Sequence, residues 1–490
     1  MELNFSPVHF IAVPLFAAFL LPLLGRVSQK LVTLVPGVVL LYLSVVAITL
    51  FPQAYDTPIV EIIAGWRPPF GITLVFGPLA AFLVTMITLI GFVVWLYSYR
   101  FIIREPLEKY YMLFMLLIAG STGIILTGDI FNLFVFLEIT AIAAYSLTAF
   151  LRDHNGAEAA FKYLLIGSFA SAFVLLAIVI LYANVGTLNM ADIALRMGDV
   201  PDKIKLTIMI LFIVGLGIEA ELFPLNGWAP DAYSQAPSPI GAVFAGIVVK
   251  AAVYALMRVL FTLFDLPTSS HFLVVMGTIT LLVAEMSAMR QQQIKRMLAF
   301  SSIGQMGLVL VAFGLGTKEG IAAALFLMFS HAVIKTMLFF SAGYLVFFSG
   351  HKNISDLEGM GREKPWTGFF FSLGALAIIG LPPFSGFWAK FYLLVSAANA
   401  SHIFLIALIL FSAIIEAVYY LRVVGRLYFK KFNDIEIRKT PFTGLLAMGI
   451  LAIVTLVIGV YPDFIHELVL PAANELLDKA AYLQYAMIGQ

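Results

Sequence analysis

Long apolar runs constrain this sequence more than any other feature. A helix needs about 20 apolar residues to cross the hydrocarbon core of a bilayer. Runs of this kind lie at roughly residues 8–25, 31–51, 75–98, 111–127, 130–150, 161–183, 206–223, 238–261, 271–289, 298–315, 320–348, 368–397, 402–426 and 442–461. They are too long, and alternate too little, for the strands of an outer-membrane barrel. We therefore predict an all-α polytopic membrane protein with about 14 transmembrane helices.

Composition excludes several other classes of protein. Hydrophobic residues make up 62% of the chain and charged residues 12%, about half the charged share of a typical soluble domain. The 29 basic and 28 acidic residues leave no basic excess to bind nucleic acid. Without cysteine the chain cannot ligate an iron–sulfur cluster, and no dense His/Asp/Glu cluster predicts a metal site. We expect no cofactor here; iron–sulfur or nickel–iron centres would belong to partner subunits.

Basic residues in the loops predict the orientation of the chain. Eighteen follow odd-numbered runs: Arg26, Lys30, Arg100, Arg104, Lys109, Arg152, Arg290, Lys295, Arg296, Lys352, Arg362, Lys364, Arg422, Arg426, Lys430, Lys431, Arg438 and Lys439. Seven follow even-numbered runs: Arg67, Arg196, Lys203, Lys205, Arg258, Lys318 and Lys479. Lys and Arg accumulate in cytoplasmic loops. We therefore expect a multi-pass protein of the cell membrane with both termini outside.

The chain reads as one membrane domain, 1–490, without a linker to a soluble domain. Its last segment, 462–490, is amphipathic around Glu467, Glu475 and Asp478. Such a tail is expected to lie along the membrane surface or to dock on a neighbour. Asp129, at the boundary of a run, is expected to be an interfacial residue or a helix N-cap.

Ionisable residues within the apolar runs are the strongest functional signal. A charge at mid-membrane costs roughly 3 kcal/mol on the insertion scale, so such residues usually pair or line a hydrated interior. Six are candidates for ion translocation: Glu138, Glu219, Lys250, His331, Lys335 and Lys390. Three more carry a weaker signal: Glu221, Glu285 and Glu416. Spread over many helices, they predict a path for protons or other ions.

Two of the runs are interrupted by proline near such residues. The seventh ends in Gly-Ile-Glu-Ala-Glu-Leu-Phe-Pro-Leu-Asn-Gly-Trp, 217–228, and the twelfth contains Ile-Gly-Leu-Pro-Pro-Phe-Ser-Gly-Phe-Trp-Ala-Lys-Phe, 379–391. Proline breaks a helix, and broken helices at matching places in two halves mark the ion sites of inverted-repeat transporters. We predict two inverted five-helix repeats, 111–261 (spans 4–8) and 271–426 (spans 9–13), with helices 7 and 12 broken.

Four motifs carry a resemblance to a known family. They are Thr-Gly-Asp-Ile-Phe-Asn-Leu-Phe-Val-Phe-Leu-Glu (127–138), Phe-Pro-Leu-Asn-Gly-Trp-Ala-Pro-Asp-Ala-Tyr-Ser-Gln-Ala-Pro-Ser-Pro (223–239), Ile-Lys-Arg-Met-Leu-Ala-Phe-Ser-Ser-Ile-Gly-Gln-Met-Gly (294–307) and Gly-Leu-Pro-Pro-Phe-Ser-Gly-Phe-Trp-Ala-Lys-Phe (380–391). Through them the chain resembles the antiporter-type subunits of complex I, Mrp cation/proton antiporters and energy-converting membrane hydrogenases. It is most similar to the Mrp D subunit.

The resemblance implies a fourteen-helix fold with a central chain of polar residues. Glu138 matches the family's glutamate on the fifth helix, and Lys250 its bridging lysine on the eighth. His331 and Lys335 match polar positions on the eleventh helix, and Lys390 matches the lysine on the broken twelfth.

One residue departs from the family pattern. Where the family usually has a lysine on the seventh helix, this chain has Glu219. Two carboxyls that share a site tend to hold one proton, so we hypothesise that the first half relays protons through Glu138 and Glu219, with Lys250 as counter-charge. The alternatives are a Na⁺ site, since carboxylates suit hard cations, or a half that no longer conducts.

These observations predict a proton- or sodium-translocating, antiporter-like subunit of a larger membrane complex. No Gly-x-x-x-x-Gly-Lys-Ser/Thr motif for ATP is present, so an ion gradient or a redox partner must drive transport. The chain itself shows no catalytic chemistry, although it could serve a redox-driven pump of the hydrogenase, sulfane reductase or quinone oxidoreductase type. Two other functions remain open: a self-sufficient transporter of an organic solute, and a structural subunit that does not conduct.

Overall fold

A computed structural model describes residues 5–103, 106–264, 266–429 and 439–487. Within these residues, eleven helices are long and apolar enough to cross a membrane. Each of the fourteen predicted runs overlaps a helix or a broken pair of helices, because in a bilayer a helix satisfies all its backbone polar groups internally. The fold class is therefore confirmed, while the number of spans stays a prediction.

The N-terminal third contains the only sheet in the described part of the chain, an antiparallel hairpin of two short strands in which Ile59 pairs with Phe76. Its elements are α1 (His9–Gly25), α2 (Gln29–Asp56), β1 (Ile59–Ile62), η1 (Ile63–Gly65), β2 (Thr73–Phe76), α3 (Pro78–Phe101), α4 (Leu107–Leu126), α5 (Ile130–Thr148) and α6 (His154–Val185). The Asp129 side chain caps α5 by accepting from Asn132 N at 2.7 Å. This confirms the predicted N-cap.

The middle of the chain supplies the interior of the bundle. Its elements are α7 (Met190–Arg196), η2 (Met197–Asp199), α8 (Asp202–Glu219), α9 (Ala229–Gln235), α10 (Ser238–Val243), the π-helical η3 (Phe244–Val248), α11 (Val249–Leu263), α12 (Leu266–Arg290), α13 (Ile294–Gly314) and α14 (Lys318–Ser349). The stretch from α10 to α11 is completely buried, and so is 94% of the most apolar part of α14. These helices form the core around which the others pack.

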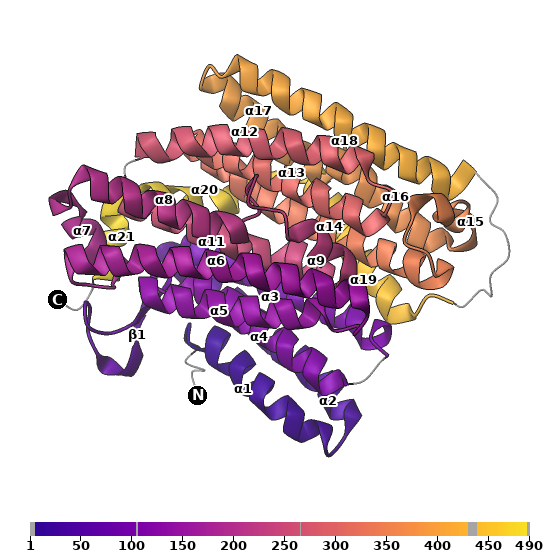
Figure 1. Ribbon diagram of the computed structural model, residues 1–490, viewed down its shortest axis with the longest axis horizontal. Helices are drawn as coiled ribbons and strands as arrows, with labels where there is room; N and C mark the ends of the chain where they lie inside the picture. Colours follow the sequence, from indigo (N-terminus) through magenta and orange to yellow (C-terminus); the bar gives the residue numbers. More distant parts are fainter. Residues whose placement is uncertain (1–4, 104–105, 265, 430–438, 488–490) are drawn as a thin grey trace.

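The last third closes the bundle. Its elements are η4 (Ile354–Leu357), α15 (Met360–Glu363), α16 (Pro365–Ile379), α17 (Ser385–Asn399), α18 (Ile403–Phe429), α19 (Phe442–Val460), α20 (Asp463–Leu477) and α21 (Lys479–Ala486). In Figure 1, α1 and α2 form one edge of the bundle, and α17 and α18 form the opposite edge. The hairpin, α7 and α21 lie at one end of the helices, and α15 lies at the other.

Matching elements recur in the two predicted repeats. Helices α6 and α14 are both 32 residues long, and each ends at a left-handed glycine, Gly186 or Gly350. Isolated β-bridges join Asp129 to Asn189 near α7 and Gln293 to Asn353 near α15, so the two bridges lie at opposite ends of the bundle (Figure 1). The repeats 111–261 and 271–426 themselves stay a prediction.

The chain breaks at both predicted places. Helix α8 ends at Glu219 and α9 begins at Ala229; helix α16 ends at Ile379 and α17 begins at Ser385. Each break contains a cis X–Pro bond and a residue with positive φ, Glu221 (62°) in the first and Gly380 (94°) in the second. The breaks expose helix ends inside the protein, where ionisable side chains can reach them.

Candidate functional site

The break between α16 and α17 provides free backbone carbonyls that bind the side chain of Lys390. Its amine donates to the carbonyls of Ile378 at 2.9 Å and Ile379 at 3.1 Å, and it forms an ion pair with Glu416 of α18. The last carbonyls of a helix lack partners within the helix, and the helix dipole favours a cation at that end. The end of α16 thus helps to stabilise a lysine that is only 8% exposed.

Two acidic residues accompany Lys390. Besides its ion pair with Lys390, Glu416 accepts a hydrogen bond from Gln305 Nε2 of α13 at 2.9 Å. Glu285 of α12 accepts from the hydroxyl of Tyr419 at 2.9 Å. Both carboxylates are 1% exposed. Glu416 is therefore the partner of a translocation candidate, and Glu285 lies in the same polar region.

Lys335 connects this region to the centre of the bundle. Its amine donates to the carbonyl of Leu298 at 3.1 Å and to the hydroxyl of Tyr420 at 2.9 Å. Tyr420 in turn forms a hydrogen bond with the Ser301 hydroxyl at 3.1 Å. Since Tyr420 follows Glu416 by one helical turn, α18 presents an acid and a hydroxyl on one face.

Lys250 extends the row through His331. The Lys250 amine is fully buried and forms hydrogen bonds with His331 Nδ1 and with the carbonyl of Ala245. Ala245 lies in the π-helical segment η3; such turns often occur at functional sites. His331 Nε2 has no hydrogen-bond partner among the described residues. His331 is therefore a buried residue of this row whose second ring nitrogen is available to accept or donate a hydrogen bond.

The break after α8 turns two glutamates in different directions. Glu219 is the last residue of α8, and Glu221 has φ of 62°, a conformation that costs about 1–3 kcal/mol in a non-glycine residue. Glu221 is completely buried, and neither of its oxygens makes a hydrogen bond of normal geometry with a described residue. Its charge interacts with those of Lys250 and Lys335, whereas Glu219 interacts most strongly with Glu138.

Glu138 and Glu219 line one small cavity between α5, α6 and α8. The Ser171 hydroxyl of α6 donates to Glu138, and Ser171 lines the same cavity. Both glutamates are half-buried, so they lie nearer the flank of the bundle than the lysine row does. No lysine or arginine is among the described residues that line this cavity.

The structure thus arranges the predicted residues in two groups. One contains Lys250, His331, Lys335 and Lys390, with Glu416 beside Lys390; the other contains Glu138 and Glu219. Lys250, expected as the counter-charge of the carboxyl pair, instead contacts His331 and has Glu221 as its acidic neighbour. The translocation roles of all these residues stay predictions.

Several polar contacts of the site were missed from the sequence. The missed residues are Ser171, Ser301, Gln305, Tyr419 and Tyr420. Ser301 and Gln305 are four residues apart, as are Glu416 and Tyr420, so helical spacing offered a signal for them. For Ser171 the sequence gave no such signal, because its partner lies on another helix.

The tail also differs from expectation. Helix α20 packs against α3 and α14 of this chain, and Glu475 forms a buried ion pair with Arg258 at 2.7 Å. Glu475 also accepts from Leu79 N at 2.7 Å. Arg258, counted above as a loop residue, is therefore an interior residue of α11 that holds the tail in place.

Comparisons with known proteins agree with this architecture. A family model described as "NADH:quinone oxidoreductase/Mrp antiporter, TM" matches residues 127–416. NADH-quinone oxidoreductase subunit N of Desulforudis audaxviator is 37% identical over 434 residues, 86% of each chain. The D subunit of the Na(+)/H(+) antiporter of Alkalihalophilus pseudofirmus is 29% identical over 482 residues, 97% of each chain.

Solved structures show the same fold. A chain of the membrane-bound sulfane sulfur reductase, an archaeal respiratory membrane complex, superposes with a TM-score of 0.92 at 40% identity, covering 98% of this chain and 99% of that one. A chain of the Mrp complex from Dietzia sp. DQ12-45-1b superposes with a TM-score of 0.90 at 24% identity, covering 99% and 100%. The second likeness concerns the fold alone.

Proposed function

This chain belongs to the NADH:quinone oxidoreductase/Mrp antiporter transmembrane family, and from that membership we propose that its buried polar row carries the translocated ions. The protein is an antiporter-like, ion-translocating subunit of a multisubunit membrane complex. The observation that carries the proposal is the row itself. It leads from Lys250 to His331 and, one helical turn along α14, from Lys335 to Tyr420, with Lys390 and Glu416 beside it.

Each residue of the row has a distinct part in this proposal. Lys250 and His331 pass a proton between them, because they share one hydrogen bond and His331 retains a second nitrogen. Lys335 passes the charge on toward Glu416 through Tyr420. Lys390 forms an ion pair with Glu416 and stabilises its negative charge, so the two residues change protonation state together.

The test is transport by the purified complex in proteoliposomes. With Lys250→Met, we expect ion transport to fall at least tenfold while the complex still assembles. Lys203→Met, at the exposed start of α8, is the matched control. Full transport with Lys250→Met would contradict the proposed row, and counterflow of an organic solute by the isolated chain would favour the alternative function.

For the first half we propose that Glu138 and Glu219 hold one proton or bind Na⁺. Two carboxylates that face one cavity repel each other unless a proton or cation lies between them. Proton flux, followed with a pH-sensitive dye, and uptake of radioactive sodium distinguish the two ions. A pair that binds Na⁺ should make proton flux depend on sodium concentration.

The driving force is proposed to come from a redox partner. The relative with 40% identity is a chain of a respiratory complex, and this chain has no cysteine for an iron–sulfur centre. Iron–sulfur or nickel–iron centres would then lie on partner subunits. Iron and nickel analysis of the purified complex tests this, and a metal-free complex that exchanges Na⁺ for H⁺ would favour the antiporter type.

We also propose that both termini lie outside the cell membrane, because basic residues concentrate in the loops near α15. The absence of cysteine makes labelling unambiguous. Ser355→Cys and Asp202→Cys each introduce one exposed thiol at opposite ends of the bundle. A membrane-impermeant maleimide added to intact cells should label Asp202→Cys and leave Ser355→Cys unlabelled; the reverse pattern would invert the orientation.

A further inference from the structure

A cavity of about 460 Å³ opens at the end of the bundle near α15, away from the polar row. It lies where α3, α5 and α14 end and where α10 and α13 begin. Its lining includes Phe101, Ile103, Phe347, Gln235, Lys295 and Lys352. A cavity of this size falls within the range of about 300–1,000 Å³ that is usual for bound small molecules.

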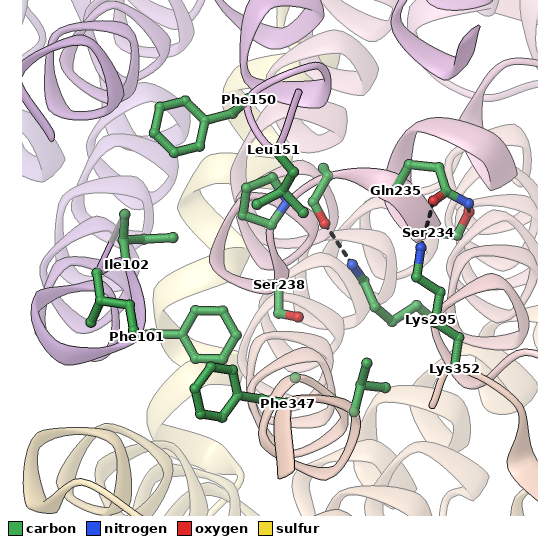
Figure 2. A pocket seen from close by; sticks show the side chains of 15 residues that line it. Phe101, Ile102, Phe150, Leu151, Ser234, Gln235, Ser238, Lys295, Phe347 and Lys352 are labelled. Atoms are coloured by element: carbon green, nitrogen blue, oxygen red, sulfur yellow. Dashed lines mark hydrogen bonds between the residues drawn. The ribbon is translucent and has the colours of Figure 1, made fainter. Parts of the chain in front are cut away.

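The cavity has two chemically different walls. Figure 2 shows the amines of Lys295 and Lys352 on one side, together with Ser234 and Gln235. Phe101, Ile102, Phe150 and Phe347 lie on the other side. Ile103 is 68% exposed and Phe347 is 45% exposed, so the apolar wall continues onto the outer surface of the protein. This arrangement fits a ligand with an anionic head and an apolar chain.

The two amines have donors to spare. Lys295 donates to the carbonyl of Ala236 at 2.5 Å, and Lys352 donates to Gln235 Oε1 at 2.8 Å. An ammonium group has three N–H donors, so each lysine can make further hydrogen bonds. Both acceptors are uncharged, and no ion pair with a described residue involves either lysine.

The charges of the two lysines also repel each other. Besides the cost of burying its charge, Lys295 experiences the like charge of Lys352, and Asp153 is its opposing attraction. Asp153, however, caps α6 by accepting from Gly156 N, and it does not line the cavity. An anion bound to the spare N–H donors of both amines would relieve this repulsion.

We propose that this cavity binds an anionic phospholipid, with its phosphate between Lys295 and Lys352 and an acyl chain along Phe101, Ile103 and Phe347. Basic pockets between transmembrane helices on the cytoplasmic side bind the head groups of anionic lipids. The stems of lysines can lie along apolar surface while their amines reach a phosphate at the interface. The assignment of the cavity to the cytoplasmic leaflet rests on the orientation proposed above. The proposed binding of an anionic lipid rests only on the residues that line the cavity.

The test uses the full complex in nanodiscs of phosphatidylcholine with a minor fraction of phosphatidylglycerol. After transfer to detergent, mass spectrometry counts the phosphatidylglycerol that each complex retains. We expect Lys295→Gln combined with Lys352→Gln to reduce retention roughly tenfold or more. Lys30→Gln, an exposed lysine at the end of the bundle assigned to the same side, should retain the lipid as the unmodified chain does.

Two further measurements distinguish a bound lipid from a free anion and from misfolding of the glutamine variant. Lys295→Arg combined with Lys352→Arg preserves both charges and should retain the lipid, whereas a general loss of folding would not be rescued by charge. A photoreactive acyl chain on phosphatidylglycerol should crosslink to peptides that contain Ile103 or Phe347.

Three results would overturn the proposal. One is equal retention by the paired glutamine variant and Lys30→Gln. Another is complete displacement of the lipid by inorganic phosphate, which would indicate a phosphate site without a lipid chain. The third is crosslinking to a partner subunit's peptide that fills the cavity. Failure of orientation labelling alone would move the site to the other leaflet without affecting these outcomes.

Discussion

The break between α16 and α17 surrounds Lys390 with two helix-end carbonyls and the carboxylate of Glu416, whereas the break after α8 leaves Glu219 beside another carboxylate, Glu138. The first arrangement is buried and complete within this chain. The second is half-buried, and among its described lining residues no cation is present.

The corresponding long helices differ in the same way. Helix α14 passes through the core, with 94% of its most apolar part buried, whereas only 33% of that part of α6 is buried. Ser171 on α6 is accordingly only partly buried, whereas His331 and Lys335 on α14 are buried. The buried Lys390 needs a matched counter-charge because burying an unpaired charge is expensive, while the partly buried carboxyls of Glu138 and Glu219 can share a proton or a cation.

The largest expected effect is on the interior pair. Glu416→Gln should lower the stability of the complex by about 3–5 kcal/mol, because it leaves the Lys390 ammonium buried without its counter-charge. Thermal unfolding of the purified complex measures this loss, and transport should fall with it.

A double variant separates stability from transport. Lys390→Met combined with Glu416→Leu removes both charges and should recover most of the lost stability, since apolar replacement of a buried pair is often neutral. Transport should stay low. Normal stability of Glu416→Gln alone would contradict the contrast between the two sites.

At the pair Glu138 and Glu219, in contrast, a substitution should affect transport more than stability. With Glu219→Gln we expect roughly a tenfold loss of transport, equivalent to about 1.4 kcal/mol in the barrier. Thermal unfolding should change little, because the side chain is only partly buried and the substitution removes one of two carboxyls that repel each other. Glu158→Gln, an exposed glutamate of α6 in a surface ion pair, is the control. Unchanged transport would rule out a translocating pair.

Tyr420→Phe tests whether the hydroxyl that Lys335 donates to contributes to transport. The loss of its hydrogen bonds should destabilise the protein by about 1 kcal/mol and slow transport severalfold. Tyr110→Phe removes a hydroxyl that is equally buried and also bonded to a serine, Ser98, but lies outside the row. If both variants slow transport equally, the effect of Tyr420 is structural.

The smallest effect is expected from Ser171→Ala. This variant removes the hydroxyl that donates to Glu138, and one such hydrogen bond is worth about 1 kcal/mol. Transport should fall by a few fold. If Glu138 and Glu219 bind Na⁺, the dependence of transport on sodium concentration should change as well. Ser168→Ala, whose hydroxyl bonds only its own helix, should leave both properties unchanged.

Much of the fold followed from local properties of the sequence. The apolar runs predicted the helices, the prolines near Glu221 and Lys390 predicted both breaks, and Asp129 was recognised as an N-cap. These features are readable because the bilayer requires each segment separately to be long, apolar and internally hydrogen-bonded. The buried ionisable residues were recognisable for the same reason, since a charge stands out within an apolar run.

Which of those charges meet was decided only by the tertiary structure. No local pattern pairs Glu416 with Lys390 or Gln305: the three meet because α13, α17 and α18 pack together. Arg258 and Glu475 likewise meet across 217 residues of sequence. Hydropathy specifies that a helix enters the membrane, but the rotation of that helix, and hence the neighbour of each charge, depends on packing between segments that are distant in the sequence.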